Sequence, residues 1–392
     1  MRILHTTSTY SPFLGGIAEI VRNISERLAH RGHEVFVATT SIPERPSHTV
    51  IGGVRVVSFD VRGNGALGMA GEVEKYRRFV QSGPWDIVVH HAATEWHMDV
   101  ILGDIGAYPW PSGVVTHGLA AIDIPAYRSY FEKLPEFLRR YALWICTSTL
   151  GEEIPFAKQH GLERPHVITN GVDPREWSSQ PVGVRQRWGI GDAPWIVNVS
   201  NHYGDHHKNH TMFFDVARRL KDTGVCATVI GNSHRAAGWN LGALGIQGGC
   251  FYACLARTLL SESVDLRRHV SREQVVSAIQ EADLLVSTSR WEANSLVLIE
   301  SMAAGTAWVS TDVGSARELT GGVVVGSSEE MAEAIRILLR DRDRRRSLGD
   351  AGRSRVKERH SWDAITSQYE SLYQEVTSNY RTNLSSVVAV GS

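Results

Sequence analysis

The first half of the chain alternates short apolar runs with amphipathic stretches. Residues 2–8 (RILHTTS) and 34–40 (EVFVATT) are apolar runs of strand length. Between them, apolar residues recur at helical spacing: Ile17, Ile20, Val21, Ile24 and Leu28. A strand, a helix and a strand in this order predict a βαβ unit, and therefore a parallel sheet with right-handed crossovers. Further runs are typical of strands buried on both faces: 54–60, 86–91, 113–118, 143–148 and 166–173.

The alternation stops at 173–193, where Pro, Gly and Ser gather, and then begins again. The later strand-like runs lie at 195–200, 226–232, 282–289, 307–312 and 321–326. We predict an α/β protein with two doubly wound Rossmann-like domains, 1–175 and 176–360, that face each other across a cleft. A chain of 392 residues is long enough for two hydrophobic cores. The cleft between the domains is the natural place for an active site.

The end of the chain carries one more helical pattern. An apolar stripe follows the helical period at Trp362, Ile365, Tyr369, Leu372 and Val376. We interpret 361–380 as a helix that crosses back towards the N-terminal domain and packs at the domain junction, with a simple core helix as the alternative. Residues 381–392 are expected to form a loose tail.

Composition narrows the class of protein. The net charge is −1, from 41 basic and 42 acidic residues, so no overall field attracts nucleic acid. Four cysteines are too few for a disulfide scaffold, and the CFYAC pair at 250–254 is expected to pack rather than to bind a metal or to act in redox chemistry. The first residues show no secretory signal, and no run reaches the roughly 18 apolar residues of a membrane span. We therefore expect a cytoplasmic protein.

Residues 289–322 contain a pattern that suits phosphate binding. A strand ends near Ser289, Glu292 follows in the loop, and Glu300 lies inside the next helix, whose start carries Asn294 and Ser295. Unpaired backbone N–H groups and the helix dipole favour a phosphate at such a start. Carboxylates on either side suit sugar hydroxyls, because they only accept hydrogen bonds. The residues alone leave an alternative open, a capped core helix with two solvated acids.

Taken together, these motifs resemble glycosyltransferase family 4, whose members are retaining enzymes with the two-Rossmann GT-B fold. The mark of that family is E-x7-E, matched here by Glu292 and Glu300, followed by the run ESMAAGTAWVSTDVGSAREL at 300–319. The resemblance covers residues 1–375. Its other motifs are GG at 15–16, RGHEV at 31–35, VTHG at 115–118, ITNGVD at 168–173 and GGVVV at 321–325.

The resemblance implies roles for residues of the C-terminal domain. Glu292 would contact the donor sugar, and Glu300 would bind the ribose of the nucleotide. The backbone amides of Asn294, Ser295 and Leu296 would hold the diphosphate, although the family more often has Gly-Phe-Gly where this chain has Ala-Asn-Ser.

The same resemblance implies roles in the N-terminal domain. Gly16, supported by Gly15, would approach the diphosphate and the sugar. His117 would contact the transferred sugar near the reacting carbon. The alternative for His117 is a histidine whose hydrogen bonds are satisfied at the end of a strand.

The histidine-rich run NHYGDHHKNH at 201–210 has three alternative interpretations. His202, His206 and His210 are spaced as metal ligands on one helix face, but Gly204-Asp205 interrupts such a helix. The resemblance instead places an Arg and a Lys in this loop, where they clamp the diphosphate. Lys208 fits the lysine, and Asn201 stands where the arginine is expected, so His202 or Arg290 is the candidate for the second cation. The third interpretation is a solvated loop.

Two stretches are candidates for contact with the acceptor. His90, His91 and Glu95 follow a strand that ends at the predicted cleft, and a plain loop is the alternative. Residues 127–144 mix aromatic side chains with four cations, which allows weak association with a membrane surface or an acceptor. A buried helix with a charged rim is the other interpretation. The four cations are Arg128, Lys133, Arg139 and Arg140.

The function that the resemblance implies is transfer of a sugar from a UDP- or GDP-sugar to a hydroxyl of a small-molecule, glycan or lipid-linked acceptor. No cofactor is expected, and no metal, because Lys208 and the backbone amides would stabilise the departing diphosphate. Front-face attack, with retention of anomeric configuration, is the expected mechanism. Two alternatives remain, a nucleotide-sugar epimerase and a non-catalytic protein that binds a nucleotide sugar or a metal.

Overall fold

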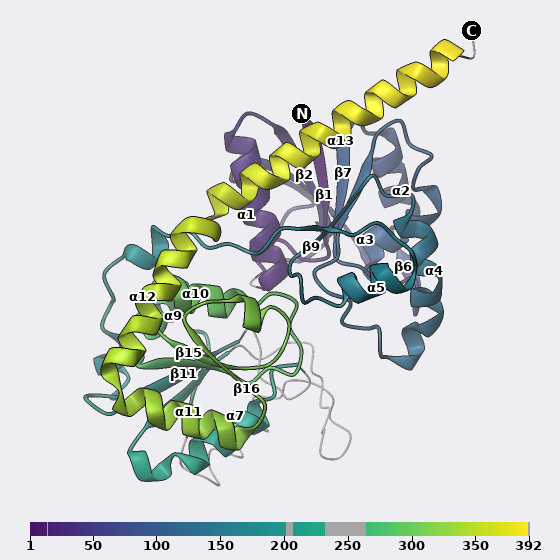
Figure 1. The fold of residues 1–392 in the computed structure, drawn as a ribbon. Helices are drawn as coiled ribbons and strands as arrows, with labels where there is room; N and C mark the ends of the chain where they lie inside the picture. The colour runs from purple at the N-terminus through teal and green to yellow at the C-terminus, as the bar shows by residue number, and fades with distance from the viewer. Residues whose placement is uncertain (14, 201–206, 232–263, 391–392) are drawn as a thin grey trace. The chain divides into compact units, whose positions relative to one another are not determined.

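The chain folds into two compact units (Figure 1). This computed structural model describes residues 1–13, 15–200, 207–231 and 264–390, and for 383–390 only the backbone. The N-terminal unit contains Met1–Asn170 and Trp362–Ser392, and the C-terminal unit contains Gly171–Ser361. The CFYAC pair lies outside the described residues, as do Asn201, His202 and His206.

The N-terminal unit is built on an eight-stranded sheet in the order β10-β9-β8-β7-β1-β2-β4-β3. All neighbouring strands are parallel except β3 and β4. Two short strands, β5 (Val61–Asn64) and β6 (Gly68–Gly71), pair separately. The strands of the sheet are β1 (Arg2–Thr6), β2 (Glu34–Thr40), β3 (His48–Ile51), β4 (Val54–Phe59), β7 (Ile87–His91), β8 (Ser112–Val115), β9 (Leu143–Cys146) and β10 (His166–Val167).

Helices cover both faces of this sheet. One face packs against α2 (Val73–Ser82), α3 (Trp96–Asp99), α4 (Arg128–Leu138) and α5 (Glu153–Gln159) in a continuous apolar core. On the other face lie α1 (Gly16–His30) and α13 (Trp362–Val390). His5 of β1 shows this second layer, because its ring nitrogens contact Ser25 Oγ of α1 at 2.7 Å and Tyr373 Oη of α13 at 3.1 Å.

The C-terminal unit repeats the architecture with a fully parallel six-stranded sheet in the order β13-β12-β11-β14-β15-β16. On one face, α7 (His210–Arg219) and α11 (Ser328–Arg340) pack against the sheet. On the other face lie α6 (Val184–Arg187), α9 (Arg272–Glu281), α10 (Leu296–Ala304) and α12 (Arg342–Arg359). The strands are β11 (Trp195–Val199), β12 (Cys226–Ile230), β13 (Val264–Arg267), β14 (Leu284–Ser287), β15 (Trp308–Thr311) and β16 (Gly322–Val325).

The strand orders locate the ligand edge of each sheet. In the N-terminal unit the connections run in opposite directions on the two sides of β1 and β7, and in the C-terminal unit on the two sides of β11 and β14. In doubly wound sheets, ligands bind outside the carboxyl ends of the strands at such a switch point. The loops that follow β1, β7, β11 and β14 are therefore the places to look for a site.

The final helix is longer than the sequence suggested. Its buried stripe contains Trp362, Ile365, Tyr369 and Tyr373, whereas Leu372 and Val376 are only half-buried. Helical backbone continues to Val390, where we expected a tail from 381. No proline or glycine occurs between 362 and 390, so nothing in this stretch ends the helix earlier.

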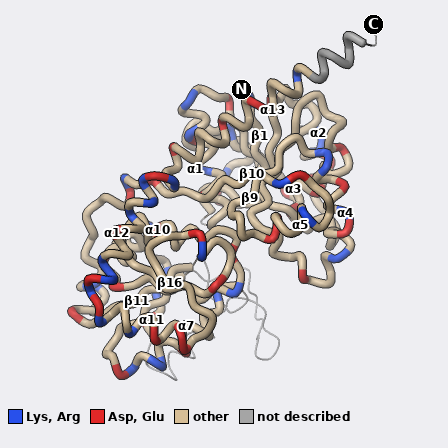
Figure 2. The backbone as a smooth tube through the Cα atoms, in the orientation of Figure 1, with Lys and Arg blue, Asp and Glu red and all other residues tan. Residues whose placement is uncertain are grey.

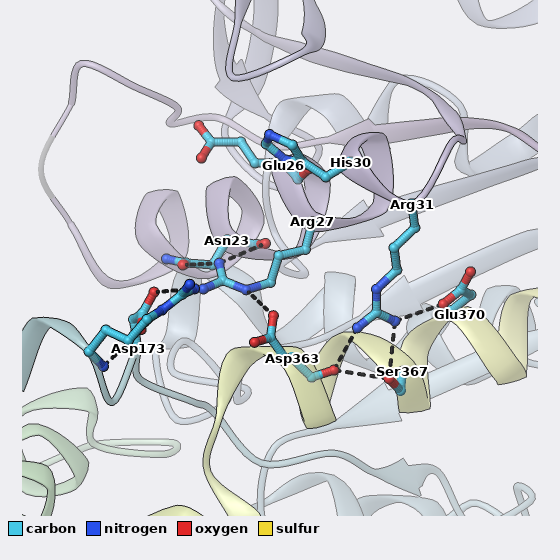
Figure 3. Close-up of polar contacts among 10 residues, drawn as sticks. Asn23, Glu26, Arg27, His30, Arg31, Asp173, Asp363, Ser367 and Glu370 are labelled. Atoms are coloured by element: carbon cyan, nitrogen blue, oxygen red, sulfur yellow. Dashed lines mark hydrogen bonds and ion pairs between the residues drawn. The ribbon is translucent and has the colours of Figure 1, made fainter.

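Charged groups fix this helix to α1 (Figure 3). Arg27 Nε donates to Asp363 Oδ1 at 3.0 Å, and Arg31 Nη1 donates to Glu370 Oε2 at 2.7 Å and to Ser367 Oγ at 3.0 Å. These bonds join residues more than 330 positions apart in the sequence, so they tie the end of the chain to the first helix.

Acidic and basic residues are interspersed over the described part of both units (Figure 2). Helix α4 turns an apolar side inward through Phe131, Leu134 and Leu138. Its two cations, Arg128 and Lys133, are exposed, as are Arg139 and Arg140 directly after it, which favours the interpretation as a buried helix with a charged rim. No helix in the described ranges is long and apolar enough to cross a membrane.

Candidate active site

The loops after β11 and β14 meet at an ion pair. Lys208 lies in the loop that follows β11, and Glu292 in the loop that follows β14. Lys208 Nζ lies 2.6 Å from Glu292 Oε1, and Ser289 Oγ donates to the same oxygen at 2.7 Å. Both charged side chains are mostly covered, with 24% and 15% of their surface exposed. The structure thus brings together two predicted site residues that are 84 positions apart.

The start of α10 lies directly beyond Glu292. Ser295 is the N-cap residue of α10, but its side chain makes no capping bond, and Leu296 is the first helical residue. Asn294 and Ser295 are buried, with 8% and 4% of their surface exposed. The first N–H groups of an α-helix have no acceptor within the helix, so this end can bind an anion.

The turn before α10 is held in place by the loop after β15. Ser315 N donates to Ala293 O at 3.1 Å. Gly314 has a φ of +52°, and a Cβ at this position would lie 2.1 Å from Glu292 O. The residue at 314 must therefore be glycine for the two loops to approach this closely.

Arg290 also reaches the loop after β11. Its backbone N donates to His207 O at 2.7 Å, and its Nη2 donates to Asn209 Oδ1 at 3.2 Å. The Arg290 side chain is exposed, so a second cation is present at this edge of the sheet. Asn201, which stands where the family has its arginine, and His202, the other candidate for the second cation, lie outside the described residues.

The structure gives no support for His210 as a ligand of a metal in the histidine-rich loop. This residue is the first of α7, is fully buried, and contacts Ser200 Oγ through Nε2 at 3.2 Å. Among the residues that the structure describes, no group of three or more His, Cys, Asp or Glu side chains is arranged to hold a metal ion. His202 and His206 are not among them.

Glu300 lies four residues beyond the start of α10, about one helical turn along its axis. Only 12% of its side chain is exposed, and its Oε1 lies 2.6 Å from Arg272 Nη2. Arg272 is the first residue of α9. Sequence reasoning did not find Arg272, because no motif marks it and it lies 28 positions before Glu300.

In the N-terminal unit, the glycine pair begins α1. Gly15 is the N-cap residue, with extended backbone, and Gly16 is the first helical residue. Glu19 N donates to Gly15 O at 2.9 Å, which closes the first turn. The pair follows β1 at the switch point of its sheet, where a phosphate can approach a helix start.

His117 follows β8 and has a left-handed backbone, with a φ of +52°. Its Nε2 lies 3.1 Å from Nδ1 of His91, and the two rings stack with centroids 5.4 Å apart. Burial lowers the pKa of His117 to about 4, so the imidazole is neutral at pH 7.

Two glutamates that sequence reasoning missed hold the loop around His117. Glu153 Oε1 accepts from Thr116 Oγ1 at 2.8 Å and from Gly118 N at 2.7 Å. Glu152 Oε2 accepts from Leu119 N at 3.0 Å. Burial raises the pKa of Glu153, although these hydrogen bonds oppose the shift.

The structure corrects the prediction that His90 or His91 contacts the acceptor. Both side chains are completely buried, because β7 lies inside the sheet and both of its faces are covered. His90 Nδ1 contacts Thr6 Oγ1 at 2.6 Å, and the same hydroxyl contacts His97 Nδ1 at 2.8 Å. Glu95, the third candidate, is partly exposed and accepts a hydrogen bond from Ser8 Oγ, and burial raises its pKa.

Two family models match the chain, one in each part. The model for Glycosyltransferase Family 4 matches residues 14–176, and the model for Glycosyl transferases group 1 matches residues 184–355. These matches take in the glycine pair and His117 in the first part, and Lys208, Glu292 and Glu300 in the second. The chain belongs to glycosyltransferase family 4.

This glycosyltransferase has curated relatives that match over different lengths. It is 32% identical to the N-acetyl-alpha-D-glucosaminyl L-malate synthase of Bacillus anthracis over 111 residues, which are 27% of this chain and 29% of that protein. It is 24% identical to the GDP-mannose:cellobiosyl-diphosphopolyprenol alpha-mannosyltransferase of Xanthomonas campestris, over 97% of this chain and 99% of that protein.

Among solved structures, the glycosyltransferase resembles Anabaena HepE in complex with UDP-glucose. The TM-score is 0.76 at 17% identity, over 96% of this chain and 100% of that chain. The likeness and the two sheets, one mainly and one fully parallel, confirm the predicted fold, two Rossmann-like domains of the GT-B type.

Proposed function

We propose that this glycosyltransferase moves a sugar from a nucleotide-diphosphate donor to a hydroxyl acceptor, with retention of configuration and without a metal. The observation that carries the proposal is the ion pair of Lys208 and Glu292 beside the start of α10, with Glu300 one turn further along. A diphosphate at the helix start would lie near Lys208, and the attached ribose would lie within reach of Glu300. Two proteins similar to this one, a GDP-mannose-dependent mannosyltransferase and HepE in its complex with UDP-glucose, support a nucleotide-sugar donor.

Sugar transfer requires that the negative charge on the departing diphosphate be stabilised. When the bond between the anomeric carbon and the phosphate oxygen breaks, both bonding electrons leave with the diphosphate. Backbone N–H groups of Asn294, Ser295 and Leu296 and the Lys208 ammonium would stabilise that charge, since they already lie in place before the reaction. Arg290 would contribute a second positive charge. This set of donors supplies what a metal ion supplies in other transferases, and for this reason we propose metal independence.

The attack is proposed to come from the face that the diphosphate leaves. The acceptor oxygen forms its bond to the anomeric carbon, and its proton passes to the departing phosphate oxygen. Glu292 would hold a hydroxyl of the donor sugar, and neutral His117 would offer one ring nitrogen to the same sugar. Gly15 and Gly16 would let α1 approach the donor. A cytoplasmic place of action and a weak association with membranes remain predictions.

The test is transfer by the purified full chain with UDP- and GDP-sugars and a panel of hydroxyl acceptors. Product is measured by mass spectrometry, its anomeric configuration by NMR, and metal dependence by adding EDTA. We expect turnover with one donor class, an α-linked product from an α-linked donor, and no loss in EDTA. An inverted product would contradict retention, and a loss that Mg²⁺ or Mn²⁺ restores would contradict metal independence.

Two substitutions test the site itself. Lys208→Ala and Glu292→Gln are each expected to lower kcat/KM by on the order of 100-fold, because each removes a group that would act on charge or position in the transition state. Lys221→Ala and Glu273→Gln, exposed residues of the same unit, serve as matched controls. Near-normal turnover in both site variants would contradict the assignment. Conversion of the donor without any acceptor would instead favour an epimerase.

A further inference from the structure

Arg272 stands between the predicted ribose-binding glutamate and a second carboxylate. Its Nε donates to Glu176 Oε1 and its Nη2 to Glu176 Oε2, both at 2.8 Å. The same Nη2 lies 2.6 Å from Glu300 Oε1. Nη2 carries two hydrogens, so it can serve both carboxylates at once, and the paired contact with Glu176 fixes the plane of the guanidinium.

The backbone segments that carry Arg272 and Glu176 are themselves held in place. Ser271 caps α9 in a capping box with Gln274, which fixes the backbone on which Arg272 begins the helix. Glu176 begins the short helix η3 (Glu176–Ser178), whose Trp177 is 4% exposed and lies beneath the guanidinium, 5.3 Å from ring centroid to Cζ. Gln280 Nε2 of α9 donates to Trp177 O at 3.0 Å, so α9 and η3 are bound together.

We propose that Arg272 is a positioning residue that holds the Glu300 carboxylate in the orientation in which it receives the ribose hydroxyls of the donor. This inference rests on the proposed function. A carboxylate has about four lone-pair positions, so the contact with Arg272 does not by itself prevent it from accepting hydrogen bonds from hydroxyls. The charge of Arg272 is maintained by its neighbours: burial disfavours it, but Glu300 and Glu176 outweigh that effect and raise its pKa.

Positioning makes a specific prediction about affinity. Without Arg272, the binding of a nucleotide must first order the Glu300 side chain, which weakens affinity by about tenfold. The reacting carbon lies at the other end of the donor from the ribose, so KM should rise while kcat stays nearly constant. Inorganic pyrophosphate carries no ribose, and its affinity should not change.

The experiment is a double-mutant cycle on the full chain with UDP and GDP as probes. Kd is measured by calorimetry for the wild type, Arg272→Ala, Glu300→Ala and the double variant, with Arg344→Ala as the control for an exposed arginine of the same unit. If Arg272 acts through Glu300, the double variant binds no more weakly than Glu300→Ala alone. Additive losses would overturn the proposal, because they would mean that Arg272 contacts the nucleotide independently.

A second substitution separates positioning from general stability. Glu176→Gln removes the charge that fixes the guanidinium. We expect it to raise the KM for the donor, by a smaller factor than Arg272→Ala does. A lower melting temperature with unchanged KM in both variants would show a merely structural role and overturn the proposal. If the wild type binds neither UDP nor GDP and transfers no sugar, the proposed function itself is wrong. If the wild type binds the nucleotide and Arg272→Ala binds it equally well, only the role of Arg272 is wrong.

Discussion

At the scale of single residues, the site depends on groups that hold the chemically active side chains. Ser289 donates to Glu292, Glu292 pairs with Lys208, and Arg272 contacts Glu300. In the N-terminal unit, Glu153 fixes the loop on either side of His117 through two hydrogen bonds. A ring nitrogen of His117 is engaged by His91, so the orientation of the imidazole is set from within the sheet.

Replacing Glu153 should therefore affect stability and turnover together. In Glu153→Ala, Gly118 N loses its acceptor inside the protein and Thr116 Oγ1 retains only Ile145 O at 3.5 Å, which costs about 1–3 kcal/mol of unfolding free energy for a buried group. Turnover should fall as well, because the loop no longer holds His117. Urea unfolding and steady-state kinetics measure the two effects. Glu163→Ala, at an exposed position of the same unit, should change neither, and an unchanged Glu153→Ala protein would contradict this role.

At the scale of elements, much of the molecule could be predicted because the hydrophobic pattern is regular. The strands of both sheets that are buried on two faces follow apolar runs, and α1 follows its apolar stripe. The short outer strands β3, β5, β6 and β13 were missed, since strands of four residues with few buried side chains leave no such pattern.

The roles predicted for Lys208, Glu292 and Glu300 came from the resemblance to glycosyltransferase family 4, and the strand pattern placed the loops of Lys208 and Glu292 at one edge of a sheet. Lys208 and Glu292 meet because β11 and β14 are neighbours, and the alternation of strands and helices indicates their shared edge. Arg272 contacts Glu300 on another helix, and Glu153 contacts the loop after β8; contacts between elements far apart in the sequence leave no local signal. The prediction for His90 and His91 was wrong because they are the last two residues of β7, a central strand. The sequence does not reveal that the end of this strand is buried as completely as its middle.

Gly314 tests how closely the two loops of the site must pack. In Gly314→Ala, the added Cβ would collide with Glu292 O and the left-handed backbone would be strained, so the turn that carries Glu292 must shift. We expect the affinity for the nucleotide to fall by roughly tenfold or more. Gly224→Ala has a comparable φ of +67° but open space around it, so it isolates the strain. Equal effects of the two substitutions on nucleotide affinity would contradict the account.

At the scale of the whole molecule, the two units share an architecture but differ in what their sheets bury. The N-terminal unit encloses five histidines: His5, His90, His91, His97 and His117. Burial lowers the pKa of all five, to about 3 for His5 and His90 and to about 4 for His117. The unit therefore folds around neutral imidazoles.

The stability of the protein should fall in mild acid. A histidine with a lowered pKa contributes stability above its unfolded pKa of about 6.5, and that stability is lost as the pH falls towards the folded value. Each such histidine can cost about 1.4 kcal/mol of unfolding free energy per pH unit in that interval. Asp99, whose pKa burial raises to about 6, acts in the opposite direction, as do Glu95 and Glu153, but the histidines outnumber these carboxylates.

Urea unfolding at pH 7.5, 6.5, 5.5 and 5.0, followed by tryptophan fluorescence, measures this dependence. The free energy should begin to decrease between pH 7.5 and 6.5 and should decrease more steeply below pH 6.5. His48→Gln, at an exposed position, should leave the slope unchanged. A free energy that stays constant down to pH 5.0 would show that the buried histidines do not titrate as described.

The most direct test of the central claim is a crystal structure of the full chain soaked with the nucleoside diphosphate that it binds, UDP or GDP. We predict the diphosphate at the start of α10, within hydrogen-bond distance of Lys208 Nζ and the backbone of 294–296, and the ribose hydroxyls on Glu300. A nucleotide bound elsewhere in the chain, with the space beside Lys208 and Glu300 unoccupied, would contradict it.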